Sequence, residues 1–180
     1  MGTRYTFQVQ SRNAFGYGSM SSAVTILAAS IPSLPAIPST SFAPDSVTVS
    51  WTAPSTNGAA ITAYIITVRQ SDGATYTVDS VNCDGAVTTI VTQRSCTIPV
   101  TTLKEAPYSL AYGSSIFAKV IAINEKGAST ESNPGNGAII ITYPDAPISL
   151  AEDTSKRTAS TLGLTWVQAA FNGGATVTDY

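Results

Sequence analysis

The sequence of 180 residues contains no histidine, and only 11% of its residues are charged. Without histidine it lacks the commonest general base, the usual catalytic triads and the commonest zinc ligand. The basic residues are scattered and the net charge is −2, so the positive surface of a nucleic-acid-binding protein is missing. We therefore expect no enzyme activity, no cofactor, no metal site, and no binding to nucleic acids or anionic membranes.

Targeting and glycosylation signals are missing too. No apolar run approaches the ~18 residues of a membrane span, and residues 1–10 alternate instead of forming the apolar block of a signal peptide. The absence of any Asn-x-Ser/Thr sequon excludes N-glycans, and without an Arg-Gly-Asp tripeptide integrin-type adhesion has no support. The acidic residues fall mostly in expected turns, where solvated charges are normal. Calcium near Asp145, Glu152 and Asp153 stays open as an alternative.

The chain has two cysteines, Cys83 and Cys96, with about a dozen residues between them. We interpret them as a disulfide, which indicates an oxidising compartment and an extracellular or cell-surface location. The alternative is a pair of free thiols in a cytosolic domain.

Serine and threonine make up roughly a quarter of the residues, well above ordinary usage. Such a surface is hydrated by hydroxyl groups rather than by ions. In a secreted chain this bias, together with proline, favours O-glycosylation. The candidate positions lie in linkers and on outward strand faces, and they are Ser33, Ser39, Thr40 and Thr48.

Residues 46–51 alternate polar and apolar side chains, which predicts a half-buried strand. The pattern returns at 161–166, about 115 residues later, which is the length of one small sandwich domain. Because each tryptophan continues the apolar face of its strand, we expect core residues and not ligand platforms. The residues expected to face inward are Val47, Val49 and Trp51, then Leu162, Leu164 and Trp166.

A second repeated sequence pattern, referred to below as an echo, has a similar period. Residues 2–13 match residues 113–124 at an offset of about 111, and each copy ends in Asn-x-x-Gly. Asparagine and glycine tolerate left-handed backbone conformations, so this motif predicts a turn into the next strand, at 23–27 and 138–142. The echo pairs Tyr5, Phe7 and Val9 with Ile116, Ala118 and Val120.

Further alternation predicts strands at 60–69, 75–78 and 96–100. The first of these has Tyr64, Ile66 and Val68 on one face, and the last contains Pro99, which predicts a sheet edge. No sustained helical period occurs, so the fold class is all-β. Proline-rich stretches at 31–38 and 143–147 predict stiff linkers at domain boundaries. A PxxP peptide ligand is the alternative function for them.

These residues resemble a known family. The run Val-Thr-Val-Ser-Trp51, then Ala-Pro54, Asn-Gly58 and Ile61-x-x-Tyr64-x-Ile66, together with Tyr5-x-Phe-x-Val9-x-x-x-Asn13-x-x-Gly16, is similar to the fibronectin type III domain. The resemblance implies tandem immunoglobulin-like β-sandwiches. It divides the chain into the C-terminal half of one domain (1–31), a complete domain (32–143) and the N-terminal half of the next (144–180). We expect Met1 to be an internal residue and Tyr180 to lie within a strand.

The resemblance also implies strands at 96–103, 115–124 and 137–142. The family usually has a tyrosine early in the strand at 115–124, whose hydroxyl anchors the preceding corner, but Ile116 stands there. We expect the segment 104–113, with Pro107, Tyr108 and Tyr112, to hold this corner instead. The segment between Cys83 and Cys96 is longer than usual and is expected to form a small disulfide-closed hairpin.

Function is predicted from this organisation. The repeats, stiff linkers and charge-poor surface favour a non-catalytic structural segment of an extracellular fibre, rod or adhesive stalk. Its partners would be neighbouring repeats of the same polypeptide, or identical chains in a filament, with covalent O-linked glycans. One alternative is a receptor-type module that recognises a protein or glycan through the loops at 54–59 and 125–134. Another is a non-catalytic appendage of a secreted enzyme.

Overall fold

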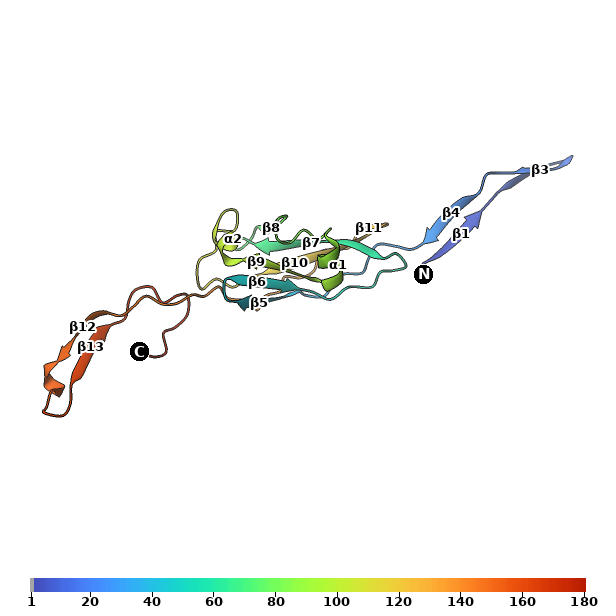
Figure 1. Cartoon of the computed structure of the whole chain (residues 1–180). Helices are drawn as coiled ribbons and strands as arrows, with labels where there is room; N and C mark the ends of the chain where they lie inside the picture. The colour runs from blue at the N-terminus through green and yellow to red at the C-terminus, as the bar shows by residue number, and fades with distance from the viewer. Residues whose placement is uncertain (1) are drawn as a thin grey trace.

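The computed structural model describes residues 2–180 and shows an elongated molecule, with a β-sandwich in the middle and a two-stranded ribbon at each end (Figure 1). In the first ribbon β1 (Thr3–Phe7) pairs with β4 (Val24–Ala28), and β2 (Gln10–Asn13) pairs with β3 (Gly16–Met20). In the last ribbon β12 (Ile148–Asp153) pairs with β13 (Gly163–Val167), and the short 3₁₀ helix η1 (Thr154–Lys156) connects them.

The sandwich contains two antiparallel sheets. One has the strand order β5 (Ser39–Ala43), β6 (Ser46–Ser50) and β9 (Ser95–Pro99). The other has the order β11 (Gly127–Ala128), β10 (Ala118–Asn124), β7 (Ile61–Arg69) and β8 (Tyr76–Val78). This arrangement confirms the all-β fold, and it places Pro99 on an edge strand, where its missing N–H costs no ladder bond.

Strand alternation builds the core between these sheets. Every second residue of β6, of β10 and of β7 from Tyr64 onward is buried, as the period of two requires. Trp51 is 7% exposed and packs edge-on against Tyr64 with ring centroids 5.1 Å apart, which confirms it as a core residue. The largest fully buried side chains are Ile66, Ile98, Leu103, Ile116, Ile140, Val47, Val49, Val68 and Val120.

Both Asn-x-x-Gly motifs form the predicted turn. Asn13 pairs with Gly16, and its side-chain oxygen accepts hydrogen bonds from the backbone N–H groups of Phe15 and Gly16. Asn124 pairs with Gly127, and its side-chain oxygen accepts from the N–H of Lys126. The turn between β2 and β3 of the first ribbon and the turn between β10 and β11 of the sandwich therefore have the same asparagine–glycine pairing.

The prediction of a disulfide-closed hairpin between Cys83 and Cys96 is wrong. The segment between the cysteines contains a short helix, α1 (Thr88–Gln93), which ends where Arg94 adopts a left-handed φ of 57°. The β-branched helix residues have low helix propensity and no side chain caps the first turn, so the sequence carries no helix signal. Ile90 and Val91 pack against the core, and this tertiary contact stabilises the helix.

Three strand boundaries also differ. The strand expected at 96–103 ends at Pro99 and continues as the helix α2 (Val100–Lys104), which buries Val100 and Leu103. The strand expected at 115–124 is regular only from Ala118. The segment 137–142 makes bonds such as Ile116 N–H to Ala138 O (2.9 Å), and an isolated bridge joins Ser115 to Ile139, but it forms no continuous strand.

The segment 104–113 packs on the sandwich as expected. Tyr108 and Leu110 are buried, and the carbonyl of Tyr108 accepts a hydrogen bond from the N–H of Ser71 (2.9 Å). The N–H of Leu110 donates to the carbonyl of Leu103 (2.9 Å). This segment closes the corner where Ile116 replaces the anchoring tyrosine.

The apolar faces of the two ribbons, whose residues match inward-facing core residues of the sandwich, are exposed. Tyr5 is 51% exposed and Trp166 is 42% exposed, whereas Ile116 and Trp51, at the matching positions of the sandwich, are 0% and 7% exposed. Nothing within residues 2–180 forms a second sheet over either ribbon. The other apolar residues exposed in this way are Phe7, Val9, Leu162 and Leu164.

Candidate functional site

Cys83 and Cys96 form a disulfide, with Cα atoms 5.3 Å apart, as predicted. Both side chains are buried. The bond holds the loop after β8 beside the sheet, where the carbonyl of Gly85 accepts a hydrogen bond from the N–H of Tyr64 (2.9 Å). The disulfide therefore fixes the loop that carries α1.

The four candidate glycosylation residues lie in different surroundings. Thr40 is 5% exposed, and its hydroxyl donates to the carbonyl of Ile116 (3.0 Å) and accepts from the N–H of Ala138 (2.9 Å). A hydroxyl in this position is not accessible in the folded domain, so the prediction of Thr40 as an O-glycosylation candidate is wrong. Ser33 and Thr48 are half-buried, and Ser39 is exposed.

Two of these residues belong to a hydroxyl-rich sheet face. On the outer face of β5, β6 and β9, residues facing each other across the strands carry hydroxyl groups in two successive rows. Within the rows the side-chain oxygens of Ser39 and Ser50 lie 3.0 Å apart, as do those of Thr48 and Thr97. The rows are Ser39, Ser50 and Ser95, then Ser41, Thr48 and Thr97. This face is hydrated without charge.

The acidic side chains stabilise turns. Asp72 accepts from the hydroxyl of Thr75 and from the N–H groups of Ala74 and Thr75, and these bonds hold the pKa of Asp72 below its usual value. Asp79 caps the turn at Val81 and Asn82 in the same way. Burial, and then the nearby Asp79 charge, raise the pKa of Tyr108 to about 12. These contacts stabilise turns and the packing around them.

Metal-binding and membrane-spanning features are not found in the described part of the chain. Within residues 2–180 no group of three or more cysteine and acidic side chains is placed to hold a metal ion, and Asp145, Glu152 and Asp153 form no such group. None of the helices described there is long and apolar enough to cross a membrane.

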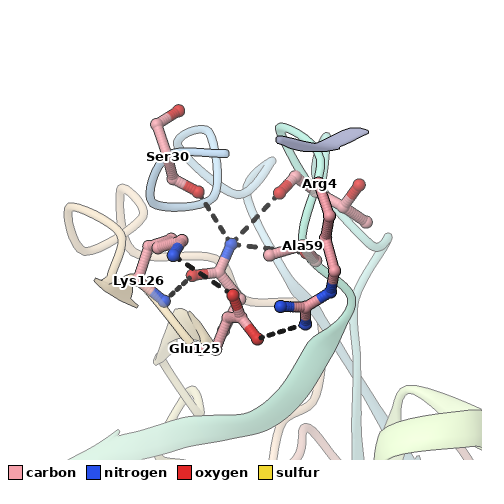
Figure 2. A network of polar contacts seen from close by, with 7 residues as sticks. Arg4, Ser30, Ala59, Glu125 and Lys126 are labelled. Atoms are coloured by element: carbon pink, nitrogen blue, oxygen red, sulfur yellow. Dashed lines mark hydrogen bonds and ion pairs between the residues drawn. The ribbon is translucent and has the colours of Figure 1, made fainter. Parts of the chain in front are cut away.

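A polar network joins the first ribbon to the sandwich. At its centre Asn124 is 4% exposed, and its amide nitrogen donates to the carbonyls of Ser30 (2.9 Å), Thr56 (3.1 Å) and Ala59 (3.3 Å). In Figure 2 dashed lines mark the hydrogen bonds that Ser30 and Ala59 make with this amide. One side chain therefore ties together the β10–β11 turn, the loop after β6 and the linker that leaves the first ribbon.

The loop after β6 holds the same linker through its own residues. The side-chain amide of Asn57 donates to the carbonyl of Ile31 (2.9 Å) and to the hydroxyl of Ser33 (3.2 Å). The N–H of Ser33 donates to the carbonyl of Ser55 (3.0 Å). Two residues at the start of the linker, Ile31 and Ser33, are thus bonded to the end of the sandwich, and the stiffness of the proline-rich linker stays a prediction.

Charged side chains complete the junction. Arg4 of β1 lies 4.0 Å from the carboxylate of Glu125, which also pairs with Lys126 at 3.2 Å (Figure 2). Because these side chains are between one-third and two-thirds exposed, solvent screens the ion pairs and each adds little to stability. The buried amide of Asn124 is the stronger contact.

The sequence predicts the turn at Asn124 but not its role at the junction. The Asn-x-x-Gly pattern explains the side-chain oxygen, which bonds its own turn. The amide nitrogen bonds residues up to 94 positions away, and no local pattern identifies such partners. Asn13 illustrates the difference, because its side chain is exposed and bonds its own turn.

Replacing Asn124 by alanine is expected to lower the free energy of unfolding of the sandwich by about 2 kcal/mol, because buried carbonyls lose their donor. The matched control is Asn13→Ala, which lies at the same position of the exposed ribbon and should change stability by less than about 0.5 kcal/mol. Urea denaturation followed by tryptophan fluorescence measures both. Equal effects of the two substitutions would contradict the bridging role of Asn124.

A comparison with protein-family models agrees with this architecture. The model of the fibronectin type III domain matches residues 32–137. A crystal structure of domains from titin is similar, with a TM-score of 0.49 and 24% identity over 74% of this chain, which spans 40% of that structure. The FN1–FN3 domains of chicken CNTN1 match with a TM-score of 0.45 and 16% identity over 76% of this chain and 42% of that one.

Proposed function

The chain belongs to the fibronectin type III family, and from this premise we propose that it is a structural repeat segment of an extracellular or cell-surface fibre, rod or adhesive stalk. Domains of this family are typically non-catalytic structural or adhesion modules. The titratable side chains described above contribute to turns, ion pairs and packing.

The junction at Asn124 is the observation that carries the proposal. A receptor-type module would present the loops at 54–59 and 125–134 to a partner. In this chain four residues that belong to those loops or border them bond the preceding linker and ribbon instead, namely Ser55, Asn57, Asn124 and Glu125. Loops that are engaged in this way favour an end-to-end connection of domains over ligand recognition.

The exposed ribbons support an array of such domains. The residues of β1 and β13 that match buried core positions of the sandwich are apolar and exposed. Contiguous apolar surface of this kind marks an interaction site. We propose that residues 1–31 and 144–180 are halves of neighbouring domains, and that neighbouring repeats of the same polypeptide cover them. Identical chains joined in a filament are the alternative.

The disulfide supports the extracellular location, because such bonds persist in oxidising compartments. An antibody against residues 32–137 should label intact, non-permeabilised cells or the material they secrete, and the label should follow extended structures. Thiol alkylation of the native protein should modify neither cysteine before reduction. Labelling that appears only after permeabilisation would contradict the location, and a discrete punctate label would contradict the fibrous role.

O-linked glycans are proposed on the exposed hydroxyl face. Ser39 is the best placed of the four candidate residues, because it is exposed on β5 and lies next to the proline-rich linker. The intact mass of the native protein should exceed that of the polypeptide. Peptide mapping should find more of the added mass at Ser39 than at Ser33 or Thr48. A mass equal to that of the bare polypeptide would exclude this modification.

A further inference from the structure

The junction that follows the sandwich repeats the backbone bonds of the junction that precedes it. Before the sandwich, the N–H groups of Ser30 and Ser33 donate to the carbonyls of Asn57 (3.1 Å) and Ser55 (3.0 Å). After it, the N–H groups of Thr142 and Asp145 donate to Gly173 (2.8 Å) and Phe171 (3.1 Å). The donors are three residues apart and the acceptors two residues apart in both junctions.

The acceptor loops share an unusual backbone conformation. Asn57 and Gly58 have φ values of 50° and 93°, and Gly173 and Gly174 have values of 72° and 85°. Each loop thus contains two consecutive residues in the left-handed region, which asparagine and glycine tolerate best. The offset of 115 residues between Trp51 and Trp166 would match Asn57 with Asn172, but the hydrogen bonds match Asn57 with Gly173, one residue later.

A glycine of the preceding segment lies against each of these loops. Gly2 and Gly113 occupy matching positions of the two echoes, with φ values of 86° and 91°. A Cβ atom on Gly2 would lie 3.1 Å from the carbonyl oxygen of Gly58, and one on Gly113 would lie 3.4 Å from that of Gly174. A Cβ atom on Gly174 would in turn clash with the backbone nitrogen of Gly113. Backbone faces backbone here, so no flexible side chain absorbs movement.

The side chains around the two junctions differ. The first has the Arg4–Glu125 ion pair and the Asn124 amide. At the second, the rings of Tyr112 and Phe171 pack edge-on with centroids 5.8 Å apart, and the Lys104 ammonium lies 3.7 Å from the centre of the Tyr112 ring. What the junctions have in common is therefore the glycine, the two left-handed residues and the pair of backbone hydrogen bonds.

We propose that these shared features form one rigid joint, used at both ends of the sandwich, which sets the same orientation between successive repeats. The partner of the left-handed loop is a glycine-bearing corner of the repeat that precedes it. This proposal rests on the structural role proposed above and specifies how the orientation between neighbouring repeats is fixed. Array stiffness then comes from backbone contacts at each joint rather than from proline in the linkers alone.

Distances between spin labels across each joint test the proposal in the purified chain with its disulfide intact. A Ser41→Cys label on β5 is combined with a Thr25→Cys label on the first ribbon, or with a Thr165→Cys label on the last. All three positions are exposed and lie outside the joints. Both pairs should give a narrow distance distribution. A broad distribution in the otherwise unsubstituted chain would overturn the rigid joint.

Substitutions of the joint glycines then test whether the backbone contacts cause the rigidity. Gly2→Val should abolish the narrow distribution at the first joint only, and Gly174→Val at the second only. The matched control is Gly73→Val, because Gly73 has a similar φ of 75° but no atom within 4 Å of its Cβ position. It should leave both distributions narrow. Distributions that survive Gly2→Val and Gly174→Val, or that the control also broadens, would overturn the proposal. These distances are measured in the purified chain and do not depend on its cellular location. The antibody labelling that tests the proposed function can therefore fail while the rigid joint is confirmed, and the reverse.

Discussion

Trp51→Ala is expected to lower the free energy of unfolding of the sandwich by about 3–5 kcal/mol, the usual range for emptying a buried aromatic site. Trp51 follows β6, where it continues the apolar face of Val47 and Val49, and its ring packs against Tyr64. Because rigid sheets surround it on both sides, the cavity left by alanine cannot collapse fully. Thermal or urea unfolding, monitored by circular dichroism, measures the loss.

The repeat supplies a matched control for this substitution. Trp166 has the same sequence context and packs against Tyr180 with ring centroids 5.4 Å apart, but it is 42% exposed on the last ribbon. Trp166→Ala should therefore leave the unfolding of the sandwich unchanged within about 0.5 kcal/mol. A Trp51→Ala chain that stays as stable as the parent would show that Trp51 is not a core residue.

Removal of the disulfide is expected to cost about 3 kcal/mol, because the bond closes a loop with a sequence separation of 13 and restricts the unfolded chain. The double variant Cys83→Ala with Cys96→Ala tests this with small apolar side chains that suit the buried positions. Urea unfolding of both proteins should show the difference under oxidising conditions.

Reducing agent provides the internal control. It should lower the stability of the parent chain to about that of the double variant, and it should leave the double variant unchanged. We expect the loop with α1 to loosen first, because its contacts with β7 depend on the position of Cys83. A double variant as stable as the oxidised parent would contradict a stabilising role for the bond.

The sequence was sufficient where a local rule determines the structure. Alternation of apolar residues located β6 and β7 and identified the buried residues of both, since side chains of a strand point to opposite faces in turn. Asn-x-x-Gly located two turns because few other residues accept their backbone conformation. The disulfide was predicted from two cysteines that close a loop of about a dozen residues, and the edge position of β9 from the proline that cannot donate to a ladder.

Features set by distant contacts were not predictable in this way. The helix α1 has β-branched residues and no cap, so only its packing against the core and the disulfide stabilise it. Thr40 resembles an accessible linker hydroxyl in sequence, yet its partners lie 76 and 98 positions away. The proposed joints contain glycines that contact loops more than fifty residues later in the chain. The second loop also has one residue more than the first, so aligning the two tryptophans matches Asn57 with Asn172 and not with Gly173, which makes the equivalent hydrogen bond.

Amide hydrogen exchange at Ser30 and Ser33, measured by NMR in the whole chain, tests the central claim most directly. If the sandwich is a stiff repeat joined end to end, these linker amides are bonded to Asn57 and Ser55 and should exchange at least about tenfold more slowly than exposed chain, because a bonded amide exchanges only when it opens. Thr142 and Asp145 should be protected likewise. Exchange of all four amides at the rate of unstructured chain would show flexible tethers, and would contradict the account.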